Sequence, residues 1–167
     1  MCIRDSYTTT PEGMQLLKDF AALSDGPYYV RVHHLLCTGN CGYGFYKWGS
    51  TNVYREREDG TPVYDYAVVD KIMDTMLACG VKPFFEIGFM PLDLVSSKYR
   101  DGEDWWGFYN QYQREYWSTP PKDYRKWYDL IMNLVNHLLD RYGLEEVKSW
   151  YFEMWNEPDI FYWKRCV

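Results

Sequence analysis

Apolar positions follow a helical spacing in three stretches of the chain. The first begins at Thr10 and Pro11, a capping residue followed by a proline, and stops before the Asp25-Gly26-Pro27 turn. The second runs over about residues 66–79 and ends at Gly80, and the third over about residues 120–142. The side chains expected on the buried faces of these helices are Leu16, Leu17, Phe20, Leu23, Val69, Ile72, Met73, Met76, Leu77, Tyr124, Trp127, Ile131, Leu134, Val135 and Leu138.

Three extended apolar segments alternate with these helices, and each contains an isolated charge that could be buried. They cover residues 28–36 (YYVRVHHLL), 81–90 (VKPFFEIGFM) and 147–155 (VKSWYFEMW), and the charges are Arg31, Glu86 and Glu153. Strands that are apolar on both faces and separated by helices predict right-handed crossovers and a parallel sheet. The fold class expected is therefore α/β.

The connections that follow the first two strands, residues 37–65 and 92–119, are much longer than the usual two to six residues. Long loops at the carboxyl ends of parallel strands are typical of an active-site face. These loops are rich in aromatic residues, among them Trp105 and Trp106, and the chain has 8 Trp, 17 Tyr and 8 Phe. Aromatic rings with polar tips suit sugar ligands, but aromatic residues in long loops can also pack against one another.

Composition and charge exclude several classes of protein. The formal net charge of −6 argues against nucleic acid as a partner, and no uncharged apolar run is long enough to span a membrane. The five cysteines form no disulfide framework; Cys37 and Cys41 could be a metal pair, but no second pair of ligands follows, so we expect neither metal nor organic cofactor. Free thiols and the lack of a visible export signal favour a cytoplasmic location.

The residue most suited to catalysis is Glu157, which follows the last predicted strand. A carboxyl group beside Trp155, in a partly desolvated cleft, suits a general acid, and the Asn156 amide could donate to it or to a substrate hydroxyl. Pro158 would fix the turn that presents the pair. By spacing alone, an equally good interpretation is the start of a helix capped by Asn156.

Four motifs resemble glycoside hydrolase family 39, the β-xylosidase and α-iduronidase group within the clan of retaining (β/α)8 glycosidases. They are YYVRVHHLL, KWGSTNVY, VKPFFEIGFMP with the later PPKDYRKW, and RYGLEEVKSWYFEMWNEP. The resemblance implies a TIM barrel, with Glu157 as catalytic acid/base and Asn156 as the residue that binds the sugar hydroxyl next to the scissile bond. It implies further that His33 contacts the sugar and that Phe89 and Trp155 wall the pocket.

Two residues within these motifs give weaker support for a role in the site. His34 departs from the family pattern, in which glycine or asparagine is commoner, and Glu86 matches a structural or pocket-lining glutamate. A retaining enzyme needs a second carboxyl group, and the family's nucleophile ends the seventh barrel strand. Glu86 lies too deep to serve easily, and Glu153 is expected to pair with a basic residue, Arg31 being a candidate.

A TIM barrel needs about 250 residues, whereas three strand–helix units are visible here. We therefore expect residues 1–167 to be one incomplete catalytic domain, a partial barrel that is inactive in isolation, and we expect residues 1–6 to be non-native. The leading interpretation is a β-xylosidase-like O-glycoside hydrolase whose partner is a carbohydrate. Two alternatives remain, a non-catalytic carbohydrate-binding module and an oligomerising part-barrel scaffold, and the sequence indicates no oligomeric state.

Overall fold

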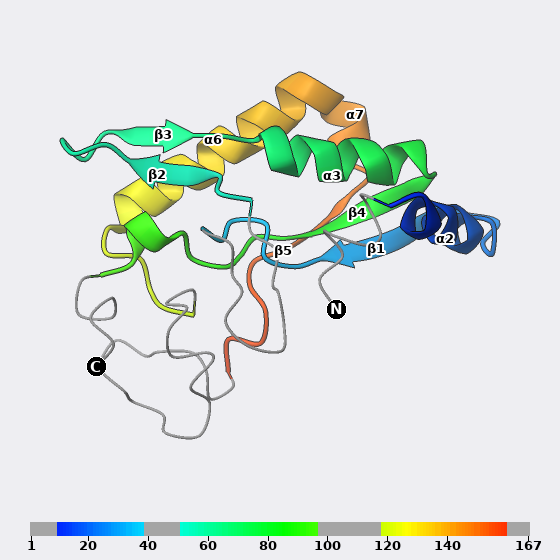
Figure 1. The fold of residues 1–167 in the computed structure, drawn as a ribbon, viewed down its shortest axis with the longest axis horizontal. Helices are drawn as coiled ribbons and strands as arrows, with labels where there is room; N and C mark the ends of the chain where they lie inside the picture. Colours follow the sequence, from blue (N-terminus) through cyan, green and yellow to red (C-terminus); the bar gives the residue numbers. More distant parts are fainter. Residues whose placement is uncertain (1–9, 39–50, 97–117, 160–167) are drawn as a thin grey trace.

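A three-stranded parallel sheet organises the computed structural model, which describes residues 10–38, 51–96 and 118–159 (Figure 1). The strands lie in the order β1 (Tyr28–Val32), β4 (Val81–Glu86) and β5 (Tyr151–Glu153). In the register, Val32 lies opposite Phe85, and Glu86 lies opposite Glu153. The α/β class with parallel strands is thus confirmed.

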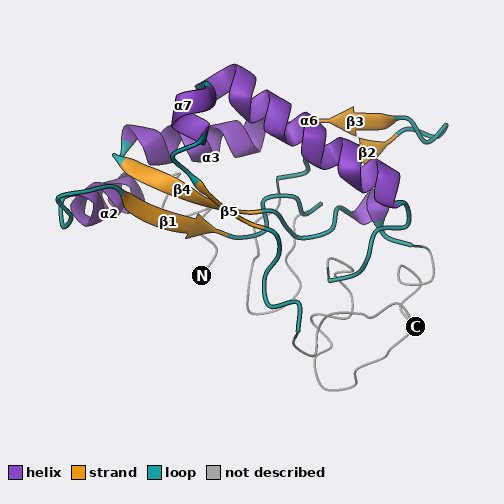
Figure 2. Ribbon diagram, turned by 180° about the vertical axis from the view of Figure 1, so that it is seen from behind, coloured by secondary structure: helices purple, strands orange, loops and turns teal. Residues whose placement is uncertain are grey.

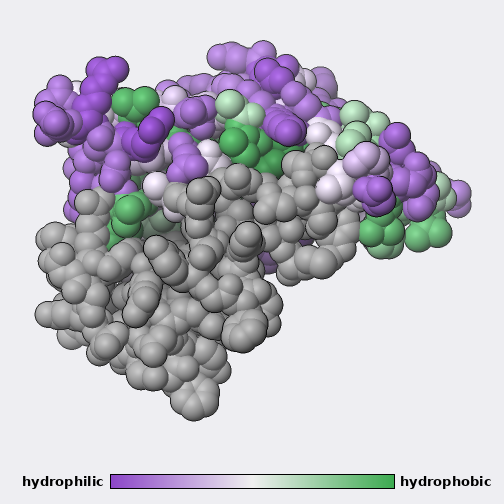
Figure 3. Space-filling model, in the orientation of Figure 1, coloured by the Kyte–Doolittle hydropathy of each residue, from purple (hydrophilic) through white to green (hydrophobic). Residues whose placement is uncertain are grey.

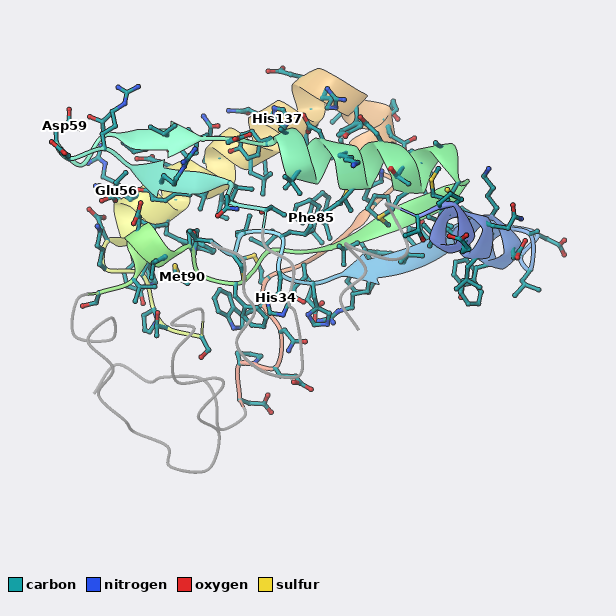
Figure 4. The ribbon with its side chains drawn as sticks, in the orientation of Figure 1. His34, Glu56, Asp59, Phe85, Met90 and His137 are labelled. Carbon is teal, nitrogen blue, oxygen red and sulfur yellow. The ribbon has the colours of Figure 1, made fainter. Side chains whose placement is uncertain are left out.

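Helices cover one face of this sheet. The helices are α2 (Pro11–Ala21), α3 (Ala67–Ala78), the 3-10 turn η1 (Leu92–Leu94), α6 (Tyr124–Tyr142) and α7 (Leu144–Val147). Both ribbon views show α3 and α6 on the same side of the sheet (Figures 1 and 2), and Figure 4 shows Phe85 between β4 and α3. No helix in the described parts of the chain is long and apolar enough to cross a bilayer.

The core fills the space between the sheet and these helices. Its fully buried side chains come from the sheet and from α2, α3 and α6, and they include Leu17, Phe85, Met73, Met76, Leu130, Leu134 and Leu138. The outer surface of the helices is polar: the space-filling view shows mostly hydrophilic residues over α6 and α7 (Figure 3). Burial of this apolar set is the main stabilising contribution to the fold.

The helix boundaries follow from local chemistry. The Thr10 side chain accepts a hydrogen bond from the Gly13 amide at 3.1 Å, and the Asp123 carboxylate caps α6 by accepting from the Arg125 amide at 2.8 Å. Gly80, just after α3, has a φ of 79°, a value that glycine adopts without steric cost.

Parts of the expected pattern were wrong. Leu16 and Leu23 are 36% and 77% exposed, because α2 ends at Ala21 and packs through Gly13 and Leu17 instead. Tyr124 is 69% exposed, because it lies in the first turn of α6, beyond the layer in which Leu130 contributes to the core.

The last strand is also shorter than expected. Residues 144–147 form α7, and only Tyr151–Glu153 pair with β4. In the extended segments at 28–36 and 81–90, the regular strands likewise end at Val32 and Glu86.

A small antiparallel hairpin, which the apolar pattern did not predict, lies in the connection between β1 and α3. It consists of β2 (Tyr54–Glu56) and β3 (Pro62–Tyr64) and lies beside α6 in both ribbon views. Its main polar anchor is Glu56, visible in Figure 4. We call the residues around this anchor, namely Tyr54, Glu56, Lys122 and Lys126, the hairpin cluster.

Candidate active site

The candidate site lies where the three parallel strands end. Backbone hydrogen bonds continue the sheet past its last paired residues, from the Ile87 amide to the Glu153 carbonyl at 2.7 Å and from the Leu36 amide to the Gly88 carbonyl at 3.0 Å. Since ligands of parallel α/β sheets bind outside the carboxyl ends of the strands, this edge is the place to look for chemistry.

One face of the sheet carries the charged side chains here. Arg31 lies opposite Phe84 in the register and Glu86 opposite Glu153, so the alternation of strand residues places all three charges on the same face. Phe85, their neighbour in β4, points the other way, toward α3 (Figure 4). The charges therefore lie on the face that α3 and α6 leave free.

Arg31 joins the three strand ends. Its Nε donates to Glu153 Oε2 at 2.5 Å, its second terminal nitrogen donates to Asn156 Oδ1 at 2.8 Å and lies 3.2 Å from Glu86 Oε2, and the other contacts His33 Nε2. We call Arg31, His33, Glu86, Glu153 and Asn156 the strand-end cluster. The expected pairing of Arg31 with Glu153 is confirmed.

The charges around Arg31 keep it protonated. Burial by itself lowers the pKa of Arg31, but the hydrogen bond to Glu153 and the negative charges of Glu86, Glu153 and Glu157 outweigh it and raise the pKa above its ordinary value. The guanidinium is therefore a permanent cation at this edge of the sheet.

Glu86 is a fully buried carboxylate at the centre of the cluster. Its Oε2 lies 2.5 Å from His33 Nδ1, whereas no donor among the described residues makes a hydrogen bond to Oε1. A Cβ at Gly88 would lie 3.0 Å from Oε1, so a larger residue there would have to displace the carboxylate by a few tenths of an ångström. Glu86 is thus a buried counter-charge, in keeping with the role expected for it.

The contact with Arg31 settles the tautomer of His33. A guanidinium only donates, so Nε2 of His33 must accept, and the ring proton then sits on Nδ1 beside the Glu86 carboxylate. His33 is about one-third exposed, and it therefore combines an anchored ring with an accessible edge.

Asn156 and Glu157 form the exposed end of the site. The Asn156 Nδ2 group donates to Glu157 Oε2 at 3.2 Å, while Asn156 Oδ1 accepts from Arg31. Glu157 has a φ of 44°, in the left-handed region that a residue with a side chain occupies at some cost. Glu157 is exposed among the described residues, in contrast to the partly desolvated position expected for it.

Aromatic rings lie beside this pair. Phe89 is buried, and its ring meets that of Trp155 edge to face at 5.2 Å; Trp155 in turn packs against Trp127 at 6.2 Å. His34 lies 4.8 Å from Phe89 on the other side. The two residues expected to wall the pocket are thus in contact with each other, next to the strand-end cluster.

His34 is buried and differs from His33 in its environment. Burial first, and the neighbouring His33 second, lower its pKa to about 3, so the ring is neutral at ordinary pH. It lies 3.2 Å from the thiol of Cys37, and its φ of 60° is in the left-handed region. Neutral His34 therefore adds no positive charge to the cluster.

The structure brings together Glu157, Asn156, His33, Phe89 and Trp155 from three separate strand ends. Trp105 and Trp106, together with the other aromatic residues of 39–50 and 97–117, lie outside the described residues, as does Cys41. Over the described ranges, no group of three or more His, Cys, Asp or Glu side chains is arranged to hold a metal ion. The sequence did not predict that Arg31 donates a hydrogen bond to Asn156. The available signal was a single arginine in an apolar strand, two positions before His33.

Such an arrangement can donate and accept one proton at an exposed carboxyl group. It can also offer an amide and an imidazole to the hydroxyls of a ligand, with a buried carboxylate and a guanidinium fixing the frame.

Known proteins with similar sequences point to one family. Residues 14–166 match the family described as Glycosyl hydrolases family 39. A β-xylosidase of Geobacillus stearothermophilus is 41% identical over 143 residues, which cover 81% of this chain and 24% of that protein. A β-xylosidase of Caldicellulosiruptor saccharolyticus is 37% identical over 166 residues, covering 97% of this chain and 30% of that protein.

Solved structures give the same picture. The crystal structure of a GH39 enzyme from Xanthomonas axonopodis pv. citri matches with a TM-score of 0.67 and 30% identity over 92% of this chain and 26% of that chain. A monomeric β-xylosidase from Caulobacter crescentus CB15 matches with a TM-score of 0.63 and 30% identity, covering 90% and 26%. The chain thus spans between about a quarter and three tenths of the length of these relatives.

Proposed function

The chain belongs to family 39 of the glycosyl hydrolases, and from this premise we propose that it carries the acid/base half of a retaining, β-xylosidase-like O-glycoside hydrolase. The observation that supports the proposal is the Asn156–Glu157 pair, held at the carboxyl ends of three parallel strands next to a buried counter-charge. The relatives described as β-xylosidases point to xylosides as the substrate class.

In the proposed reaction, Glu157 serves twice. It first gives its proton to the departing glycosidic oxygen, and as a carboxylate it then takes a proton from the water that releases the sugar. An exposed position suits this role, because the carboxyl group must reach both a bulky leaving group and solvent water.

The second carboxyl group of a retaining enzyme lies about 5–5.5 Å from the first and attacks the sugar. Glu86 is fully buried against Arg31 and His33, and Glu153 is bound to the Arg31 guanidinium, so both are committed to ion pairs. We therefore propose that the nucleophile belongs to the larger part of the (β/α)8 barrel that the relatives contain, and that residues 1–167 form a partial barrel.

The sugar contacts follow from the same arrangement. The amide nitrogen of Asn156 would bind the hydroxyl next to the scissile bond, and His33 another hydroxyl of the same sugar. Phe89 and Trp155 would form the apolar wall, and Trp105 and Trp106 are proposed as further stacking surfaces for the carbohydrate.

The test is replacement of the acid/base in the complete gene product. We expect Glu157→Gln to lower kcat/KM on alkyl β-xylosides, whose leaving groups need a proton, by about 10² to 10⁴, the usual contribution of a general acid. Glu145→Gln is the matched control, because Glu145 is an exposed carboxylate on α7 that pairs only with Lys148 among the contacts described. Equal turnover by the Glu157→Gln protein and the unmodified protein would refute the assignment.

A further inference from the structure

We propose that Arg31 is a positioning residue that decides which end of the Asn156 amide faces the sugar. This inference rests on the function proposed above, because it concerns how Asn156 meets the substrate. The amide of asparagine has an accepting oxygen and a donating nitrogen of nearly the same shape, so it can lie either way round unless a neighbour selects one orientation.

Arg31 makes that selection. Its terminal nitrogen lies 2.8 Å from Asn156 Oδ1, and a guanidinium has donors only. The oxygen of the amide must therefore face Arg31, and the nitrogen must face the opposite side, where it donates to Glu157 Oε2 at 3.2 Å. The reversed amide would point its NH₂ at a cation and its oxygen at a carboxylate, which is unfavourable at both ends.

The guanidinium is itself held in place before any ligand binds. Glu153 accepts from its Nε at 2.5 Å, Glu86 lies 3.2 Å away, and His33 accepts from its remaining terminal nitrogen. These anchors come from β1, β4 and β5 or directly follow them, so the sheet fixes the direction of the Asn156 hydrogen bond. Preorganisation of this kind keeps a donor aimed at a hydroxyl without cost at the moment of reaction.

The consequence for specificity is that Asn156 offers a donor to the substrate. A sugar with a hydroxyl at that position gains a hydrogen bond that strengthens in the transition state, whereas a deoxy sugar does not. Without Arg31 the amide oxygen would lose the donor that fixes its direction, and the enzyme would lose much of its discrimination between the two sugars.

The experiment compares two substrates, 4-nitrophenyl β-xyloside and its 2-deoxy analogue, in the complete gene product. Nitrophenolate leaves with little help from an acid, so the kinetics report on the sugar contact. For Arg31→Met we expect kcat/KM on the xyloside to fall by about tenfold to a hundredfold, as for a lost charge-assisted hydrogen bond, with less than about threefold change on the deoxy analogue. Arg31→Lys, which keeps the charge but not the fork of donors, should lie in between.

The control is Arg141→Met, which removes a guanidinium on α6 that is bound to Asp74 on α3, in the helical layer and not at the strand ends. It should leave the ratio of the two kcat/KM values unchanged. Equal losses on both substrates for Arg31→Met, or no loss on either, would overturn the proposal, because a merely structural role cannot tell the two sugars apart.

Different experiments test the proposed function and the positioning role of Arg31, so one can be refuted without the other. If Glu157→Gln were as active as the unmodified protein, the proposed function would be wrong, but a crystal structure of Arg31→Met would still judge the positioning. We expect the Asn156 amide in that structure to have left its contact with Glu157; an amide in its original orientation would show that Arg31 does not set it.

Discussion

The strand-end cluster and the hairpin cluster are both built around one charge, but they differ in how completely that charge is satisfied. In the hairpin cluster, Glu56 Oε1 accepts from the Tyr54 hydroxyl at 2.8 Å and from Lys126 at 2.9 Å, and Oε2 accepts from Lys122 at 2.7 Å. In the strand-end cluster, one guanidinium faces the two carboxylates of Glu86 and Glu153.

The two clusters differ in whether their carboxylate oxygens all accept hydrogen bonds. Both oxygens of Glu56 are hydrogen-bonded, and its backbone amide donates to Asp93 at 2.8 Å. By contrast, Oε1 of Glu86 receives no hydrogen bond from the described residues. A saturated cluster fixes an element, here the hairpin on α6, whereas an incompletely satisfied cluster at a strand end is typical of a site in which local stability has been given up for function.

The largest expected effect comes from removing the shared cation. Arg31→Met leaves the buried Glu86 carboxylate without its guanidinium, and breaking such a pair costs about 3 kcal/mol in the free energy of unfolding. Urea denaturation measures this loss. Adding Glu86→Gln should recover a large part of it, since the uncompensated charge is then gone, and strictly additive losses in the double variant would contradict this view of the cluster.

A second effect depends on pH and concerns His34, next to the strand-end cluster. Its folded-state pKa of about 3 lies below the ordinary value of 6.5, so the unfolded chain binds the proton first and stability is lost as pH falls below 6.5. We expect this one group to lower the free energy of unfolding by about 2 kcal/mol between about pH 7.5 and pH 5.

The test of this effect is His34→Asn, because asparagine tolerates the positive φ of this position and does not titrate. Unfolding curves across that pH range should be flatter for this variant than for the unmodified protein. His137→Asn on α6 serves as a control that should keep the steeper decline. Identical pH dependence for His34→Asn and the unmodified protein would exclude His34 as its source.

The hairpin cluster should respond more moderately. Glu56→Gln weakens the bonds to Lys122 and Lys126, and we expect a loss of about 1–2 kcal/mol at neutral pH. Burial raises the pKa of Glu56, but the two lysines and the Tyr54 hydroxyl outweigh it and hold the pKa below its ordinary value.

The pH dependence of this loss has a defined sign. A lowered folded-state pKa gives stability that is present above the unfolded value, about 4.3, and disappears as pH falls through the folded value. The stability difference between Glu56→Gln and the unmodified protein should therefore shrink in acid. A difference that stays constant down to about pH 2 would argue against the ion pairs as its cause.

The sequence pattern predicted the framework of the sheet well. Arg31 was the candidate basic partner of Glu153, since both are charges in otherwise apolar strands, and their contact confirms that pairing. Caps at Thr10 and Gly80 were visible because they depend on local chemistry alone.

Three features of the structure could not be predicted from the sequence pattern: the hairpin, the Arg31–Asn156 hydrogen bond and the exposure of Glu157. The hairpin strands have three residues each, too short for a period to emerge, although Asp59-Gly60 is a common turn signal. The bond from Arg31 to Asn156 joins residues 125 positions apart, and the exposure of Glu157 depends on the turn that follows β5. Both are properties of the assembled strand ends, and no local pattern encodes them.

The smallest predicted effect sharpens the comparison by touching the hairpin without touching the site. Gly60, in the hairpin turn, has a φ of 79°, and a Cβ there would meet only the Lys126 ammonium at an ordinary 3.5 Å. Gly60→Ala should therefore cost about 1 kcal/mol through backbone strain alone, while Gly26→Ala, with open space around it and no such φ, should cost close to nothing. If the hairpin cluster serves stability and the strand-end cluster serves chemistry, Gly60→Ala lowers the urea midpoint and leaves kcat/KM on aryl xylosides unchanged. A fall in kcat/KM comparable to that of Arg31→Lys would mean that the hairpin also shapes the site, and the division between the two clusters would have to be abandoned.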